Sequence, residues 1–129
     1  MANARFATLQ GHKYINLETF RKNGQSVQTP VWFAEQPPRE PEKLYVYSTG
    51  DSGKAKRIRN SGRVRVAPCD MRGKLLGEWI EARADILEGQ EAQHGMQLLA
   101  KKYFPWKQLL GVFALFARHK RVVFAIRPA

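Results

Sequence analysis

Alternation of apolar and polar residues along the chain predicts a mainly β protein. Several stretches repeat with the two-residue period of a half-buried strand and are separated by short polar or glycine-containing turns. The predicted strands cover residues 13–20, 26–35, 43–49, 63–70, 75–87 and 120–128. Helical spacing of apolar residues appears in 88–104, and 106–119 is a second candidate helix. Many short antiparallel strands with few helices favour a small barrel over a doubly wound sheet.

Glycine and proline residues define local features of these strands. The pair Asn23-Gly24 is a strong signal for a tight β-hairpin. Pro30 lies inside the second predicted strand, and proline cannot donate to a ladder, so this strand is expected at a sheet edge or with a bulge. Gly77 interrupts the long predicted strand 75–87, which indicates a bulge or a close backbone approach.

The densest positive charge lies in a predicted short helix, Gly53 to about Asn60, which follows the third strand directly with Ser52 as its N-cap. Helix N-terminal N–H groups and hydroxyl groups at a strand end can bind an anion. Positions 54 and 57 share a helix face, whereas position 56 reaches back only through its long side chain. The candidate phosphate ligands are Ser48, Thr49, Lys54, Arg57 and, by reach, Lys56. The alternative is a solvated basic helix with an ordinary N-cap, and the spacing of a P-loop is absent.

Two stretches that contain tryptophan are candidates for contact with a planar ring. In QTPVWF, Trp32 and Phe33 alternate sides of a strand, so one can face the core and the other a ligand. A bulge at Pro30 would present backbone groups to a heterocycle. Further along, Gly77 and Trp79 share a strand face by the two-residue period. Each tryptophan has an ordinary core position as its alternative reading.

Charge narrows the class of partner. The net charge is +11, with 22 Lys and Arg against 11 Asp and Glu, which implies nucleic acid or a phosphorylated small molecule. No strand interleaves basic and aromatic residues as single-strand binders do, so nucleic acid is disfavoured. The three histidines lack metal-ligand spacing, and no metal is expected. No nucleophile–base pair is recognisable, so catalytic residues stay unassigned and any enzyme chemistry is expected to reside in a cofactor.

The remaining features predict one domain over residues 1–129 in a reducing compartment. The single cysteine, Cys69, excludes an internal disulfide framework and is interpreted as a small buried residue. The longest apolar stretch, 109–117, is far shorter than the roughly 20 residues of a membrane span, and no signal peptide opens the chain. We therefore expect a cytoplasmic protein without a membrane partner.

Three motifs give the chain a family resemblance. They are T-P-V-W-F, S-x-K-x-x-R-I-R and A-P-C-D-x-R-G-K-x-x-G, within TFRKNGQSVQTPVWF and YVYSTGDSGKAKRIRNSGRVRVAPCDMRGKLLGEWIEARADIL. On the basis of these motifs, roughly residues 5–128 resemble the pyridoxamine 5'-phosphate oxidase-like superfamily. The resemblance is closest to its flavin/deazaflavin oxidoreductase branch, which uses FMN or coenzyme F420.

The resemblance implies an FMN-binding split β-barrel that forms a homodimer, with cofactors in clefts between the subunits. It places Thr29, Pro30 and Val31 along the cofactor ring. It assigns the phosphate end to Ser48, Thr49, Lys54 and Arg57, with Lys56 assisting. Gly77 and Trp79 would lie where the ring meets the partner subunit.

The activity implied by the resemblance is hydride transfer between FMN or coenzyme F420 and a small organic substrate. Pyridoxamine-phosphate oxidases proper have a longer C-terminal region with substrate-phosphate residues, and this chain ends at IRPA, so vitamin B6 oxidation is not expected. The alternatives are a flavin- or haem-binding module without turnover and, less favoured, a basic nucleic-acid-binding barrel.

Overall fold

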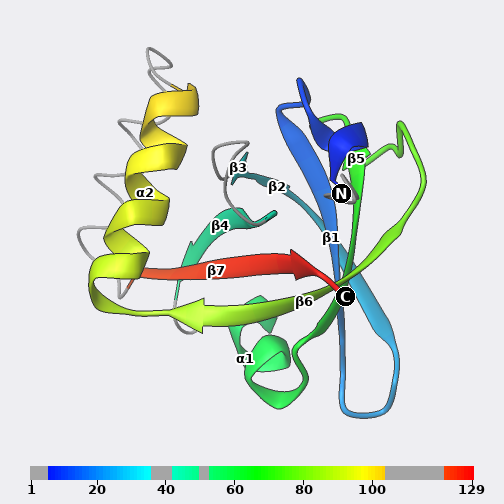
Figure 1. Cartoon of the computed structure of the whole chain (residues 1–129). Helices are drawn as coiled ribbons and strands as arrows, with labels where there is room; N and C mark the ends of the chain where they lie inside the picture. Colours follow the sequence, from blue (N-terminus) through cyan, green and yellow to red (C-terminus); the bar gives the residue numbers. More distant parts are fainter. Residues whose placement is uncertain (1–5, 36–41, 50–52, 104–120) are drawn as a thin grey trace.

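The computed structural model describes residues 6–35, 42–49, 53–103 and 121–129. Its seven strands form one curled antiparallel sheet, with a short helix at one end and a longer helix against its outer surface (Figure 1). In chain order the elements are η1 (Ala7–Leu9), β1 (Tyr14–Phe20), β2 (Ser26–Trp32), β3 (Ala34–Glu35), β4 (Leu44–Thr49), α1 (Gly53–Asn60), β5 (Arg63–Cys69), β6 (Ile80–Leu87), α2 (Gly89–Tyr103) and β7 (Arg121–Pro128). The predicted mainly β class is confirmed.

The sheet has the strand order β2-β1-β5-β6-β7-β4-β3. Its two edge strands, β2 and β3, are consecutive along the chain and are separated only by Phe33. The chain therefore joins both edges of the sheet and brings β2 close to β4, yet no backbone pairing links these two strands in the described residues. We call this gap in the ladder the split. A barrel that is closed by its chain but open between two strands is the expected split β-barrel.

The first hairpin follows the sequence prediction, with one difference. The Asn23-Gly24 turn is present, and Gly24 has a φ of 90°, which glycine adopts without steric cost. The register between β1 and β2 is uninterrupted, so Pro30 lies in an edge strand and not at a bulge. The strand predicted over 26–35 is divided at Phe33, whose ring is fully buried in the core.

The strand predicted over 75–87 is shorter than expected, because β6 begins only at Ile80. The preceding residues fold back on β5, where the Leu76 N–H donates to the Pro68 carbonyl (2.8 Å). A Cβ added at Gly77 would lie 2.7 Å from Pro68 Cγ, so glycine is what lets the loop pack on β5. The close approach expected at Gly77 is therefore confirmed, whereas the prediction that the strand begins at residue 75 is wrong.

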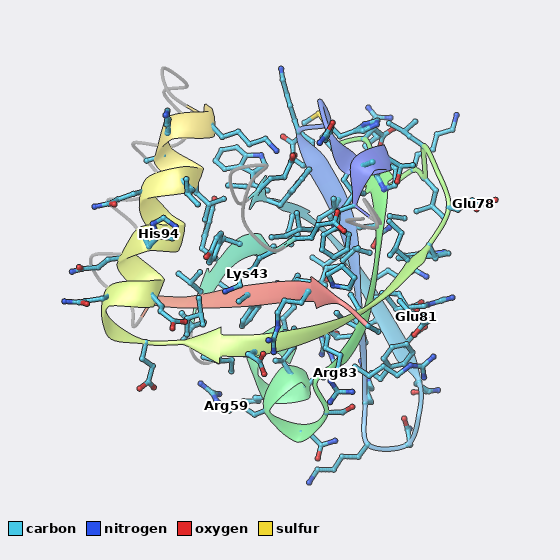
Figure 2. The ribbon with its side chains drawn as sticks, in the orientation of Figure 1. Lys43, Arg59, Glu78, Glu81, Arg83 and His94 are labelled. Atoms are coloured by element: carbon cyan, nitrogen blue, oxygen red, sulfur yellow. The ribbon has the colours of Figure 1, made fainter. Side chains whose placement is uncertain are left out.

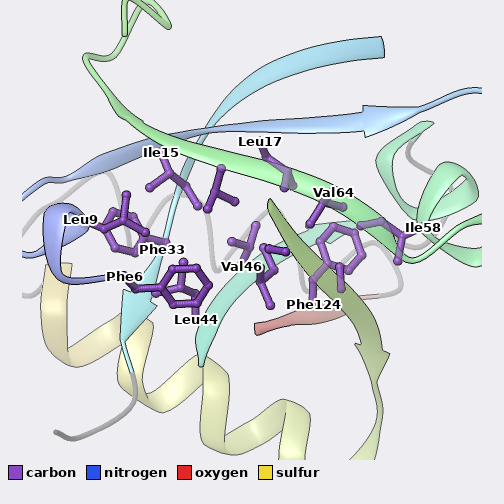
Figure 3. Close-up of a cluster of buried hydrophobic side chains, with 14 of the residues drawn as sticks. Phe6, Leu9, Ile15, Leu17, Phe33, Leu44, Val46, Ile58, Val64 and Phe124 are labelled. Carbon is purple, nitrogen blue, oxygen red and sulfur yellow. The ribbon is translucent and has the colours of Figure 1, made fainter. Parts of the chain in front are cut away.

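Alternating side chains of the strands fill the barrel with apolar residues (Figure 3). The predicted helix α1 closes one end of the barrel with the buried side chains of Ala55 and Ile58. Helix α2 covers the outer surface, where Leu99 is fully buried against β4 and β7. Two predictions, the helix over 106–119 and the N-cap Ser52, lie outside the described residues.

Candidate functional site

The split between β2 and β4 is bordered by Thr29, Pro30 and Val31, three of the residues predicted to contact a ring. β2 pairs with β1 on one side, and no strand pairs with its other side in the part of the chain that the structure describes. β4 pairs with β7 along its length but with β3 only at Leu44 and Tyr45. A strand edge presents backbone N–H and C=O groups that can bind a planar ligand.

Side chains of β2 face both sides of this edge. Thr29 and Val31 lie opposite the fully buried Leu17 and Ile15 of β1, so they point toward the barrel interior. Both remain half-buried, because the split leaves this part of the interior uncovered. Pro30 points to the outer surface. Thus Thr29 and Val31 line the split from inside, and Pro30, which lacks an N–H, contributes only its backbone carbonyl.

Three aromatic rings form a row across β1, β2 and β4. Tyr14 and Trp32 have ring centroids 6.5 Å apart, and Trp32 meets Tyr47 edge-on at 6.3 Å. All three are half-buried, in contrast to the fully buried Phe33, so the prediction that one of the two rings of the motif faces the core is confirmed for Phe33, and contact of Trp32 with a ligand stays a prediction. Burial, and secondly the neighbouring Tyr14, raises the pKa of Tyr47 to about 12, so its hydroxyl keeps its proton at neutral pH.

The basic helix places Arg57 at the end of the split nearest α1. The Arg57 Nε donates a hydrogen bond to Thr19 Oγ1 in β1 (2.5 Å). Its guanidinium lies over the first turn of α1, where a Cβ added at Gly53 would be only 2.7 Å from Arg57 Nη1. Thr19 therefore orients the Arg57 side chain, and the absence of a side chain at Gly53 leaves room for it beside the N-terminus of the helix.

Two more cations lie near Arg57. Burial lowers the pKa of Lys54, and the charge of Arg57 lowers it further. Burial likewise lowers the pKa of Arg57, with a further contribution from Arg21 in the β1–β2 hairpin. Neither Lys54 nor Arg57 forms an ion pair with a carboxylate among the described residues. We call Arg21, Lys54 and Arg57 the basic corner, and its charge favours an anion.

The other predicted phosphate residues occupy different positions. Ser48 is buried near the end of β4 and, by alternation with Val46, faces the barrel interior on the same side as Thr19. Thr49 is the last residue of β4. Lys56 is exposed on α1.

Arg59 lies apart from the basic corner, as its helical position predicts. It lines a cavity of about 490 Å³ together with Gly89 and Ala92, where α2 begins. Figure 2 shows Arg59 beside α1 and beneath β6. Arg59 is therefore a suitable control for the charge of the helix.

Gly77 and Trp79 do not line the split of their own chain. The Trp79 ring covers the guanidinium of Arg65 in β5, 4.9 Å from the ring centroid. β1 lies between β5 and β2 in the sheet. Figure 2 shows Glu78, the residue between them, at the right-hand edge of the molecule and away from α1. Within one chain these two residues are separated from the other predicted ligands.

Trp79 also covers a polar cluster on the outer surface of the sheet. Glu18, only 2% exposed, accepts hydrogen bonds from Arg65 (2.5 Å) and Gln28 (3.0 Å). Burial alone would raise the pKa of Glu18, but these two hydrogen bonds and the Arg65 charge together hold it below its usual value. In the single chain, Trp79 therefore covers the partly exposed Arg65, whose ion pair with the buried Glu18 lies beneath it.

Other chemistry receives no support from the described residues. They contain no cluster of His, Cys, Asp or Glu that could hold a metal ion. Burial, and secondly Asp70, raises the pKa of the buried Cys69 to about 11, so its thiol stays protonated and unreactive. None of the helices in the described ranges is both long and apolar enough to cross a bilayer.

Sequence reasoning missed four residues around the split: Tyr14, Thr19, Arg21 and Tyr47. None of them belongs to a recognisable motif. Only the pairing of β1 with β2, and the closeness of β2 to β4, bring them to the predicted ligands. Strand register is the signal that would have found them.

Comparison with known proteins identifies the family of the chain and supports its split β-barrel fold. The sequence profile of the pyridoxamine 5'-phosphate oxidase family matches residues 2–129. The chain therefore belongs to this family, in the superfamily that its motifs resemble. A search of curated protein sequences finds no match.

Solved structures share the fold at low sequence identity. The conserved hypothetical protein Rv2991 from Mycobacterium tuberculosis has a TM-score of 0.70 and 24% identity, covering 99% of this chain and 81% of that one. A putative pyridoxamine 5'-phosphate oxidase from Listeria innocua has a TM-score of 0.64 and 16% identity, covering 95% and 89%. HutZ, the haem storage protein from Vibrio cholerae, has a TM-score of 0.67 and 13% identity, covering 95% and 85%. These likenesses support the fold.

Proposed function

We propose that the protein is a cytoplasmic, single-domain oxidoreductase that binds FMN or coenzyme F420 in the split and transfers a hydride between it and a small organic substrate. The observation that carries the proposal is the basic corner, which lies at one end of the split and has no carboxylate partner among the described residues. The split suits a cofactor that has a planar ring and a phosphate. The ring would lie at the end bordered by the edge of β2, and the phosphate would lie at the basic corner. The bound cofactor would supply the hydride chemistry.

The residues of the split fit such a cofactor in charge and in space. Gly53 has no side chain, so the Arg57 guanidinium can lie against the first turn of α1, beside the N-terminus of the helix. Lys54 and Arg57 would hold the phosphate by charge-assisted hydrogen bonds, with Ser48 and Thr49 at the neighbouring strand end. Lys56 would assist from the exposed side of α1.

At the other end of the split, backbone and aromatic groups would orient the ring. At the edge of β2, Thr29 and Val31 would face the ring with their side chains, and Pro30, which has no N–H, would offer its carbonyl as a hydrogen-bond acceptor. Trp32 and Tyr47 would pack against the ring and keep water away from the reacting face. The protonated Tyr47 hydroxyl would act as a hydrogen-bond donor. Positioning, and not acid–base catalysis, is the role we propose for these side chains.

A second candidate is a binding protein without turnover, and the fold of HutZ favours it. Haem is usually held by an axial side chain, most often a histidine. Of the described histidines, His12 precedes β1, and His94 lies on α2 with its ring edge-on to Tyr45 of β4 at 5.7 Å. The basic corner, which suits a phosphate, is therefore the feature that favours a flavin-type cofactor over haem.

An absorbance spectrum of the purified protein tests the proposed function. We expect the visible bands of a flavin or a deazaflavin, either as isolated or after reconstitution with the cofactor. Reduction by a nicotinamide or deazaflavin donor, followed by oxidation on adding a substrate, would separate an enzyme from a binding module. A haem spectrum would instead contradict the proposal.

We also propose a homodimer, with cofactor sites shared between the subunits. The loop before β6 exposes three large apolar side chains, Met71, Leu75 and Leu76, which suits a protein contact. Gly77 and Trp79 would then reach the cofactor ring of the other subunit. Light scattering at micromolar concentration is expected to give twice the 14.8 kDa mass of the chain, and a monomer mass would remove the shared site.

Thr19 is expected to act as a positioning residue for Arg57. Thr19→Val keeps the shape of this buried side chain but removes the acceptor of the 2.5 Å hydrogen bond. A hydrogen bond of a charged group is worth about 1.5–3 kcal/mol, and because Thr19 acts on the cofactor only through the position of Arg57, FMN binding should weaken by part of this, roughly three- to tenfold. Thr19→Ser should restore binding to within about twofold, because it keeps the hydroxyl. Equal FMN affinity of the valine variant and the wild type in a fluorescence titration would exclude this role.

A further inference from the structure

We infer that the buried Glu18 is a positioning residue for Trp79. It acts through the guanidinium of Arg65 and sets the indole ring in the orientation in which Trp79 would meet the cofactor ring of the other subunit. The inference deepens the proposed function and rests on it, because the shared cofactor site belongs to that proposal. Glu18 itself lies on the outer surface of β1 and has no other role in the proposed chemistry.

Glu18 belongs to a row of polar side chains that crosses four neighbouring strands. In register, Glu18 of β1 lies opposite both Gln28 of β2 and Arg65 of β5, and Arg65 in turn lies opposite Glu81 of β6. Leu17, the neighbour of Glu18, faces the barrel interior, so the row lies on the outer surface of the sheet. Glu18 is nevertheless only 2% exposed, whereas the Glu81 side chain is 52% exposed. A carboxylate buried to this extent is costly unless its partners are well placed.

Both oxygens of Glu18 accept hydrogen bonds. Oε1 accepts from Arg65 Nε (2.5 Å), and Oε2 accepts from Gln28 Nε2 (3.0 Å). Glu81 Oε2 lies 3.8 Å from the same Arg65 Nε, so Glu18 is the nearer of the two carboxylates. A hydrogen bond from Nε restricts rotation of the guanidinium, since Nε lies in the plane of that group. Glu18 therefore determines which face Arg65 presents to its surroundings.

The guanidinium of Arg65 supports the ring of Trp79. The backbone beside Trp79 is fixed on both sides, because the Leu76 N–H donates to β5 (2.8 Å) and Ile80 pairs with Val66. The orientation of the ring is left to side-chain contacts. Arg65 Cζ lies 4.9 Å from the ring centroid, within the range of a cation–π contact. Trp79 is half-buried, so part of its surface stays available to a second subunit.

A second route from Glu18 to a cofactor site runs through β2. Gln28, which donates to Glu18, precedes Thr29 at the edge of the split. A change at Glu18 that disturbed β2 would weaken cofactor binding whether or not Trp79 were present, whereas an effect that passes through Trp79 would disappear when Trp79 is removed. A double-mutant cycle therefore separates positioning of Trp79 from a disturbance of the sheet.

The orientation of Trp79 is tested first, by fluorine NMR of protein labelled with fluorotryptophan and recorded without FMN. The Trp79 resonance is assigned by its loss in Trp79→Phe. Glu18→Gln, which keeps the shape of the side chain but removes its charge, should shift or broaden this resonance. Arg65→Lys should do the same, because it keeps the charge and loses the planar group, and it serves as the second variant if Glu18→Gln does not fold. Glu81→Gln, the matched control at the exposed carboxylate, should leave the resonance in place.

The consequence for the cofactor is tested by FMN titration, followed by flavin fluorescence. Glu18→Gln should weaken FMN binding roughly three- to tenfold, as part of the value of a hydrogen bond of a charged group. In the Trp79→Ala background, the same change should alter FMN affinity by less than about twofold. Glu81→Gln should stay within about twofold of the wild type in either background.

The outcomes separate the inference from the proposed function. A Trp79 resonance that neither Glu18→Gln nor Arg65→Lys moves would overturn the positioning role. Equal weakening of FMN by Glu18→Gln with and without Trp79 would assign the effect to β2 and overturn it as well. If Trp79→Ala leaves FMN affinity unchanged while Lys54→Ala weakens it, the inference fails and the phosphate site stands. Failure of both Lys54→Ala and Arg57→Ala to weaken FMN would overturn the proposed function itself.

Discussion

Replacing both Lys54 and Arg57 with alanine is expected to weaken FMN binding by roughly two to four decades. Each charge-assisted hydrogen bond to phosphate is worth about 1.5–3 kcal/mol, and about 1.4 kcal/mol corresponds to tenfold in affinity. Each single variant should therefore lose about one to two decades. The two losses need not add, because both side chains meet the same phosphate. Fluorescence titration of the two single variants and the double variant measures these losses.

Arg59→Ala is the matched control for these variants. It removes the same charge from the same helix, but Arg59 lines the cavity next to α2 and not the split. Its FMN affinity should stay within about threefold of the wild type, and none of these half-buried or exposed residues should change stability much. If Arg59→Ala weakens FMN as much as Lys54→Ala, the basic run is only a solvated face and the phosphate site is misplaced.

Phe124→Ala is expected to cause a large loss of stability. The Phe124 side chain is fully buried in the barrel interior (Figure 3). Truncating a buried phenylalanine to alanine typically lowers the free energy of unfolding by about 3–5 kcal/mol, through lost burial and the cavity left behind. Equilibrium unfolding in urea measures this change.

Gln90→Ala provides the comparison, because Gln90 is exposed at the start of α2. This change should alter the free energy of unfolding by no more than about 0.5 kcal/mol. If Phe124→Ala unfolds at the same urea concentration as Gln90→Ala, the barrel interior is not packed as described.

Local sequence signals correctly predicted the elements whose boundaries depend on residues adjacent in the sequence. Helix α1 has the predicted bounds, Gly53–Asn60, and the Asn23-Gly24 hairpin is present. The break at Phe33 could not be read locally, because it arises where the chain leaves one sheet edge for the other. Gly77 was recognised as unusual, but its contact with Pro68 on another strand could not be predicted from spacing.

The candidate site was also predictable only in part, because some of its residues are grouped by local spacing and others only by contacts between strands. Lys54 and Arg57 share a helix face by their spacing, and Thr29 to Val31 lie in a motif that resembles the family. Thr19 and Arg21 come to the site through the β1–β2 hairpin and the packing of α1. Tyr14 and Tyr47 join Trp32 only across strands. Cross-strand neighbours depend on register, which the sequence pattern alone does not define.

The central claim is that the corner formed by Arg21, Lys54 and Arg57 holds the phosphate of a flavin-type cofactor. Riboflavin and FMN differ only in that phosphate, so their dissociation constants for the cofactor-free protein test the claim most directly. We predict that FMN binds at least about two decades more tightly than riboflavin, since at least two charge-assisted hydrogen bonds are lost without the phosphate. Equal affinities for riboflavin and FMN would contradict the account.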